Sequence, residues 1–163
     1  MQLFILDPEP EAAVMMLCDV HVRKMCLETA QILSSVIVRR GGVLLEQMPR
    51  VYNINHPVIT ALDTPFKINW AVRHNEALQC EYVYRFGRRH AYWELTAAYC
   101  KELFTAGVVA EDWSFARNFS RRNITAASIV SAYREYYRYK KQVLSRWHYT
   151  RREEPVWLSF HDG

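Results

Sequence analysis

The chain contains few of the residues that interrupt helices: its 163 residues include only five glycines and six prolines. Such a composition favours a mainly α-helical fold. Long apolar runs are also missing, since no stretch approaches the roughly 18 uninterrupted apolar residues of a membrane-spanning helix. The first residues, MQLFILDPEPE, lack a basic region and turn acidic at once, so we expect no signal peptide.

Metal and cofactor motifs are absent as well. The four cysteines form no CxxC pair, and the histidines form neither HxxxH nor HExxH. There is no Walker loop, GxGxxG or GxSxG. Cys18 and Cys26 fall on the apolar side of a predicted helix, and we interpret them as buried thiols in a reducing cytoplasm. We therefore predict no cofactor, leaving open a divalent cation that bridges phosphates.

Acidic residues are nearly missing from one region of the chain. Residues 117–152 contain ten Lys or Arg and a single acid, Glu135, although the net charge of the whole chain is only +4. This asymmetry indicates a surface for a polyanion, and nucleic acid is the first candidate. A solvated basic face without a partner is the alternative.

The length predicts one domain, residues 1–163, large enough for a hydrophobic core. We expect a compact helical bundle with long irregular loops at 43–65 and 108–127. Leu3–Leu6 is predicted to be a brief strand or a buried arm. Apolar periodicity predicts four helices, at about Glu11–Val38, Pro65–Arg88, Ala91–Thr105 and Ala126–His148.

The first predicted helix carries an unusual polar stripe. His21, Lys24 and Glu28 follow one another at i, i+3 and i+7, with Gln31 at i+10, so all four fall in one narrow arc. A base and a carboxylate make His21 and Glu28 candidate proton-transfer residues, and Lys24 is a candidate anion contact. The alternative is a surface stripe with a Lys24–Glu28 ion pair, worth about 0.2–0.5 kcal/mol.

Two further helices supply candidate substrate-binding residues. Arg85, Arg88 and His90 gather at the end of the second helix, which predicts an anion pocket rather than simple compensation of the helix dipole. The last helix sets a tyrosine stripe beside a basic stripe, as expected where rings stack on bases and cations meet phosphates. Core packing of the tyrosines is the alternative. The candidates on this helix are Arg134, Tyr136, Tyr137 and Lys140.

Other polar and aromatic side chains are candidates for reading a base. Asn55 and His56 belong to the loop NINHP, where a loop-structuring histidine is the alternative. Asn75 lies within an apolar stripe, where a buried amide must find hydrogen-bond partners. Tyr82 lies on the same helix and completes the set.

The chain contains an ordered set of motifs: LDP at Leu6–Pro8, CDxHxxKMxxETAQxL at Cys18–Leu33, NHP at Asn55–Pro57, EYxxRFGRxH at Glu81–His90 and AYRxYYxxK at Ala132–Lys140. This set resembles a family of small phage proteins. Its members are often identified as pyrimidine-dimer DNA glycosylases, similar to the phage endonuclease V type of compact helical enzyme. The family is also similar to candidates for phage thymidine hypermodification, in which an amino acid such as glycine is joined to activated 5-hydroxymethyluracil in DNA.

For the transferase, the resemblance implies that pyrophosphate leaves the exocyclic methylene of the base. His21 or Glu28 would take the proton of the incoming amine. Tyrosines would hold a base turned out of the duplex, and Asn55 or Asn75 would read its edge. Cations would stabilise the departing pyrophosphate. The residues implied for these last contacts are Lys24, Arg85, Arg88 and Arg134 for the pyrophosphate, and Tyr82, Tyr136 and Tyr137 for the base.

For a glycosylase with AP-lyase activity, the resemblance implies an N-terminal amine nucleophile beside a carboxylate, here Glu28. Gln2 is bulky and favours retention of Met1, which departs from the small N-terminal residue of that enzyme. A non-catalytic DNA-binding protein that uses only the basic half is the third alternative. The expected partners are DNA and a free amino acid, and the expected location of this phage-encoded protein is the host cytoplasm.

Overall fold

The computed structural model describes residues 1–51 and 53–159. Over these residues the chain is mainly helical and contains no strand, which confirms the predicted class. No helix among them is long and apolar enough to cross a bilayer. The elements are α1 (Pro10–Met15), α2 (Asp19–Arg39), α3 (Pro57–Thr60), α4 (Pro65–Phe86), the 3-10 helix η1 (Trp93–Leu95), α5 (Thr96–Leu103), α6 (Ile129–Val143) and α7 (Val156–Ser159).

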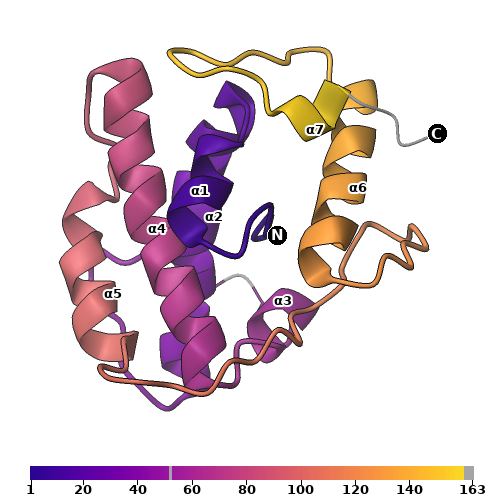
Figure 1. The fold of residues 1–163 in the computed structure, drawn as a ribbon. Helices are drawn as coiled ribbons and strands as arrows, with labels where there is room; N and C mark the ends of the chain where they lie inside the picture. Colours follow the sequence, from indigo (N-terminus) through magenta and orange to yellow (C-terminus); the bar gives the residue numbers. More distant parts are fainter. Residues whose placement is uncertain (52, 160–163) are drawn as a thin grey trace.

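The two long helices α2 and α4 form the centre of the fold. They run antiparallel, since Asp19 at the start of α2 pairs with Arg85 at the end of α4. Helix α1 packs on α4, and α5 packs on both α4 and α2 (Figure 1). Helix α6 stands on the other side of the N-terminal arm, with α7 against it. Cys18 and Cys26 are buried free thiols, as predicted.

Leu3–Leu6 is a buried arm rather than a strand. The ring of Phe4 lies 4.7 Å from that of His21 and 5.2 Å from that of Tyr137, so the arm fills the space between α2 and α6. Phe4 has a φ of 49°, and the N–H of Leu6 donates to its carbonyl at 2.8 Å. Burying a phenylalanine contributes about 1.5–3 kcal/mol. That gain offsets the roughly 1–2 kcal/mol that left-handed backbone costs.

The prediction of one continuous helix over Glu11–Val38 is wrong, because the helix breaks at Met16–Cys18. The backbone of Cys18 is extended, with ψ 161°. Distant side chains accept or donate the hydrogen bonds that an unbroken helix would make internally. Arg85 donates to the carbonyls of Met15 and Leu17, Tyr149 donates to that of Met16, and the N–H of Cys18 donates to the hydroxyl of Tyr137.

The other helices are close to their predicted positions. Gly87 ends α4 in left-handed geometry with φ 68°, as the sequence indicated. The third predicted helix is divided between η1 and α5. The last begins at Ile129, where the hydroxyl of Ser128 accepts the N–H of Ser131 at 3.0 Å, and ends at Val143 rather than His148. The four-residue helices α3 and α7 were not predicted, since so few residues show no periodicity.

A buried ionic cluster joins α2, α4 and the segment 148–152. The side chain of Arg85 is fully buried, with its Nε 2.6 Å from Glu81 and its Nη1 3.0 Å from Asp19. Arg152 donates to both oxygens of Glu81 at 2.9 Å, and the hydroxyl of Thr150 donates to Asp19 at 2.6 Å. Burial alone would raise the pKa of Asp19, but the hydrogen bonds from Thr150 and Arg85 hold it below its usual range.

A buried histidine on α4 makes stability depend on pH. Burial lowers the pKa of His74 from 6.5 to about 3, and neither ring nitrogen has a hydrogen-bond partner among the described residues. The unfolded chain therefore binds more protons between these values, and stability falls as the pH drops through about 6.5. His74→Leu removes one titrating group, so urea unfolding should show a flatter decline from pH 7 to pH 5 than in the wild type.

His21, whose pKa is lowered in the same direction, remains in both proteins, so the decline should be reduced rather than abolished. Above pH 5 the buried carboxylates stay ionised in both folded and unfolded chains and add little to the slope. Parallel curves for the two proteins would contradict the assignment of this pH dependence to His74.

Candidate functional site

Helices α2 and α6 bring predicted catalytic and phosphate-binding residues to one side of the molecule. On α2, Lys24 and Glu28 form an ion pair at 3.1 Å, with 57% and 16% of their side chains exposed. On α6, Lys140 lies 5.2 Å from the centroid of the Tyr136 ring. Lys24 and Lys140 both lower the pKa of His21, so both lie near it. Lys24, Glu28, Lys140 and His56 are together called the candidate face below.

His56 stands immediately before α3, which packs against α2. Its Nδ1 accepts the N–H of Val58 at 3.2 Å and caps the helix, so the loop-structuring role is present. Burial and then the α-amino group of Met1 lower the pKa of His56, whereas Glu28 raises it. The α-amino group of Met1 and the carboxylate of Glu28 therefore both lie within electrostatic range of the His56 imidazole.

His21 lies beneath the candidate face rather than on it. It is 4% exposed, and its Nδ1 is 2.8 Å from the hydroxyl of Tyr137. The same hydroxyl accepts the N–H of Cys18 at 2.8 Å, so Tyr137 joins α6 to both residues. Burial, then Lys24 and Lys140, lower the pKa of His21 to about 3. An imidazole with this pKa is a weak base at neutral pH, which leaves Glu28 as the better candidate for proton transfer.

Five of the predicted substrate-binding residues lie in the core. The guanidinium of Arg85 is committed to Glu81, Asp19 and two backbone carbonyls, with no surface left for a phosphate. Its placement corrects the sequence interpretation: the charge at the end of α4 is partly structural. The aromatic stripe of α6 is also mainly core. The other buried members are Asn75, Tyr82, Tyr136 and Tyr137, each no more than 7% exposed.

The remaining candidates are divided between internal and open positions. Arg134 donates to the carbonyl of Leu6 at 2.7 Å and is half-buried, so it anchors the N-terminal arm. His90 is half-buried against the ring of Tyr82. Arg88 is exposed just beyond α4, and Asn55 is exposed in the loop before α3. The structure therefore pairs Lys24 with Glu28 directly, and it leaves Lys140 within electrostatic range of His21 and His56 within electrostatic range of Glu28. It does not bring the whole predicted set together.

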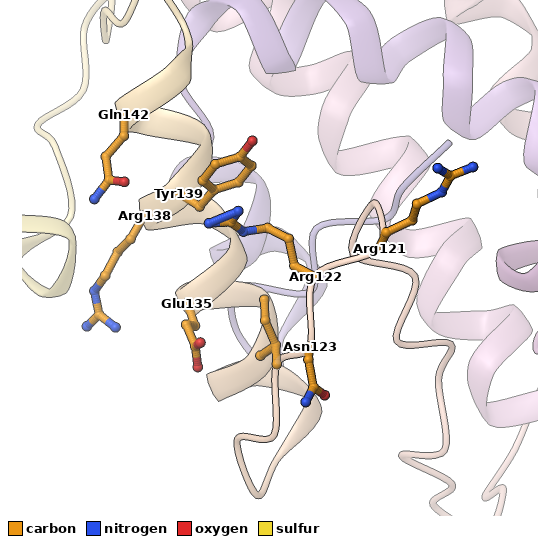
Figure 2. A pocket seen from close by; sticks show the side chains of 8 residues that line it. Arg121, Arg122, Asn123, Glu135, Arg138, Tyr139 and Gln142 are labelled. Atoms are coloured by element: carbon orange, nitrogen blue, oxygen red, sulfur yellow. The ribbon is translucent and has the colours of Figure 1, made fainter.

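Sequence reasoning missed a pocket between residues 120–124 and α6. Its volume is about 480 Å³, and neither Glu28 nor His56 lines it. The pair Arg121-Arg122 in a basic loop was the available signal, but nothing local in the sequence indicated a concave shape. Figure 2 shows the side chains around it. They are Arg121, Arg122, Asn123, Ile124, Glu135, Arg138, Tyr139 and Gln142.

Comparisons of the chain with known protein families, with curated proteins and with solved structures found no match. Within the described ranges, no three His, Cys, Asp or Glu side chains are grouped so that they could hold a metal ion.

Proposed function

We propose that this protein is a DNA-modifying enzyme that joins an amino acid to pyrophosphorylated 5-hydroxymethyluracil in DNA. A helical fold of the endonuclease V type belongs to the same proposal. The observation that carries it is the ion pair of a partly exposed carboxylate, Glu28, with Lys24, on a helix whose His21 also lies within electrostatic range of Lys140. Two elements far apart in sequence, α2 and α6, create this arrangement (Figure 1).

The proposed reaction needs both kinds of group. The amine nitrogen of the amino acid attacks the exocyclic methylene carbon of the base, and the bond from that carbon to the pyrophosphate oxygen breaks. The bonding pair leaves with pyrophosphate. The attacking amine must lose a proton, which Glu28 accepts. Lys24 and Lys140 meet the negative charge that develops on the leaving group, the electrostatic role expected to contribute most to such a step.

A DNA glycosylase with AP-lyase activity is a second candidate, favoured by one observation. The α-amino group of Met1 and the carboxylate of Glu28 both alter the pKa of His56. An amine near a carboxylate is the pair that glycosidic cleavage through a Schiff base requires. Gln2 is buried and bonded to Asn118 and Tyr133, so it holds Met1 in this position.

One experiment separates these activities. The protein is incubated with DNA containing hydroxymethyluracil pyrophosphate and a mixture of amino acids, and the DNA is digested to nucleosides for mass spectrometry. We expect an aminated nucleoside. Strand scission and a protein–DNA adduct trapped by borohydride would instead support the glycosylase. Salt-sensitive binding with neither product would identify a non-catalytic DNA-binding protein, and the absence of binding would contradict all three.

A further inference from the structure

The pocket between residues 120–124 and α6 contains a preformed stack. The guanidinium of Arg122 lies over the ring of Tyr139, 3.5 Å from its centroid. Figure 2 shows the two groups lying together over the pocket. The volume of about 480 Å³ falls within the roughly 300–1,000 Å³ of small-molecule sites. Tyr139 covers one face of the planar cation, and Arg122 is exposed at the rim of the pocket.

The backbone beneath this stack is strained. Ser120 and Arg121 have φ values of 53° and 66°, a left-handed conformation that costs on the order of 1–3 kcal/mol per residue. The turn is fixed by the hydroxyl of Ser120, 2.8 Å from that of Tyr136, and by the buried ring of Phe119. Such a turn fixes the direction in which the two arginines leave the chain. Figure 2 shows Arg122 directed toward Tyr139 and Arg121 directed away from it.

Most cations of the basic half are committed elsewhere in the protein, whereas those of this turn are open. In the described part of the chain, the side chains of Arg121 and Arg122 form neither a hydrogen bond nor an ion pair; the same holds for the side chains of Lys140 and Arg146. The committed cations donate to backbone carbonyls or carboxylates within the fold. They are Arg117, Arg134, Arg138, Lys141, Arg151 and Arg152.

The pocket adjoins the candidate face through Tyr136. One side of this residue contacts the turn through Ser120, and its ring lies below Lys140. A strand whose target base is held at Glu28 would therefore pass from Lys140 across the turn toward the pocket. The carboxylate of Glu135 also lines the pocket. It disfavours a compact dianion such as free phosphate and favours a ligand with a flat, nearly neutral group in the pocket.

We infer that this pocket binds an unstacked nucleotide of the DNA strand next to the target base. The base stacks on the face of Arg122 opposite Tyr139, continuing the pair that Arg122 forms with Tyr139, and Arg121 contacts the adjoining phosphate. Base stacking on arginine and aromatic side chains is sequence-tolerant and suits a strand opened for chemistry on one base. This inference rests on the proposed function, because it assumes a DNA substrate.

The test uses a single-stranded oligonucleotide containing hydroxymethyluracil next to 2-aminopurine, whose fluorescence reports stacking. We expect Arg122→Ala to weaken binding on the order of 5- to 100-fold, the range of base-stacking contacts. It should also remove the fluorescence change seen with the wild type. Arg122→Lys keeps the charge but not the planar face, so it should preserve the salt dependence of binding and still lose most of the affinity.

Arg146→Ala is the matched control, since it removes an equally open cation outside this pocket. It should weaken binding only slightly, lower the salt dependence and retain the fluorescence change. If Arg122→Ala and Arg146→Ala weaken DNA binding equally and leave the 2-aminopurine signal unchanged, the protein binds DNA but the assignment of a nucleotide to this pocket is wrong. If the wild type neither binds the oligonucleotide nor forms the aminated nucleoside, the proposed function fails, and this inference fails with it.

Discussion

Glu28→Gln is expected to lower the rate of amino acid transfer by about 10²–10⁴-fold, the usual contribution of a positioned proton acceptor. Glutamine keeps the shape of the side chain but cannot take the proton of the attacking amine. The substitution removes only one partner of the Lys24 ion pair, which is on a half-exposed surface and worth less than about 1 kcal/mol. Folding and DNA affinity should therefore remain close to wild type.

The measurement is the initial rate of aminated-nucleoside formation, followed by mass spectrometry, with fluorescence anisotropy for DNA affinity. Glu76→Gln is the matched control, because Glu76 is exposed on α4 and lines a separate pocket with Arg73 and Cys80. Its rate should equal that of the wild type. If Glu28→Gln turns over normally, the candidate face is not the site of the chemistry, whichever base reaction the protein performs.

Arg85→Ala is expected to lower the free energy of unfolding by about 3–5 kcal/mol, the typical effect of removing one partner from a buried ion pair. Arg85 serves two carboxylates, Glu81 and Asp19, and also the backbone at the break between α1 and α2. Without it, the carboxylates of Glu81 and Asp19 lose one of their donors, and the carbonyls of Met15 and Leu17 lose the guanidinium that binds them. Urea unfolding followed by circular dichroism measures the change.

Arg89→Ala is the comparison. The ion pair of Arg89 with Glu94 has the same 3.0 Å separation as that of Arg85 with Asp19, but it is largely exposed. It should change stability by no more than about 1 kcal/mol. Arg85→Lys should recover only part of the loss, since an ammonium lacks the planar fork that serves several acceptors at once. Equal losses from Arg85→Ala and Arg89→Ala would contradict the structural role assigned to the cluster.

The helices that periodicity located are those whose boundaries are set locally. Gly87 ends α4 because glycine adopts left-handed geometry freely, a property readable from sequence. The break between α1 and α2 was not readable, because its hydrogen bonds come from Arg85, Tyr137 and Tyr149, remote in the chain. Apolar residues continue across the break at helical spacing, so the pattern alone predicts one helix.

The same distinction explains which site residues could be predicted. In sequence, Arg85 and Arg88 look alike, but Arg85 also has Asp19, 66 residues away, as a partner. Only its i, i+4 relation to Glu81 hinted at a structural role. The tyrosine stripe of α6 could not be assigned to core or surface before the N-terminal arm was placed against it. Lys24 and Glu28 were found because one helical turn brings them together.

The ionic cluster also has a consequence for synthesis of the protein. Thr150 and Arg152 are needed to complete the donors around Asp19 and Glu81, which belong to α2 and α4. The carboxylates of α2 and α4 therefore stay incompletely paired until residues near the end of the chain have been synthesised. Since a ribosome adds about 5–20 residues per second, the nascent chain spends several seconds with this cluster open. A chain that stops before residue 148 is expected to depend on chaperones or be degraded.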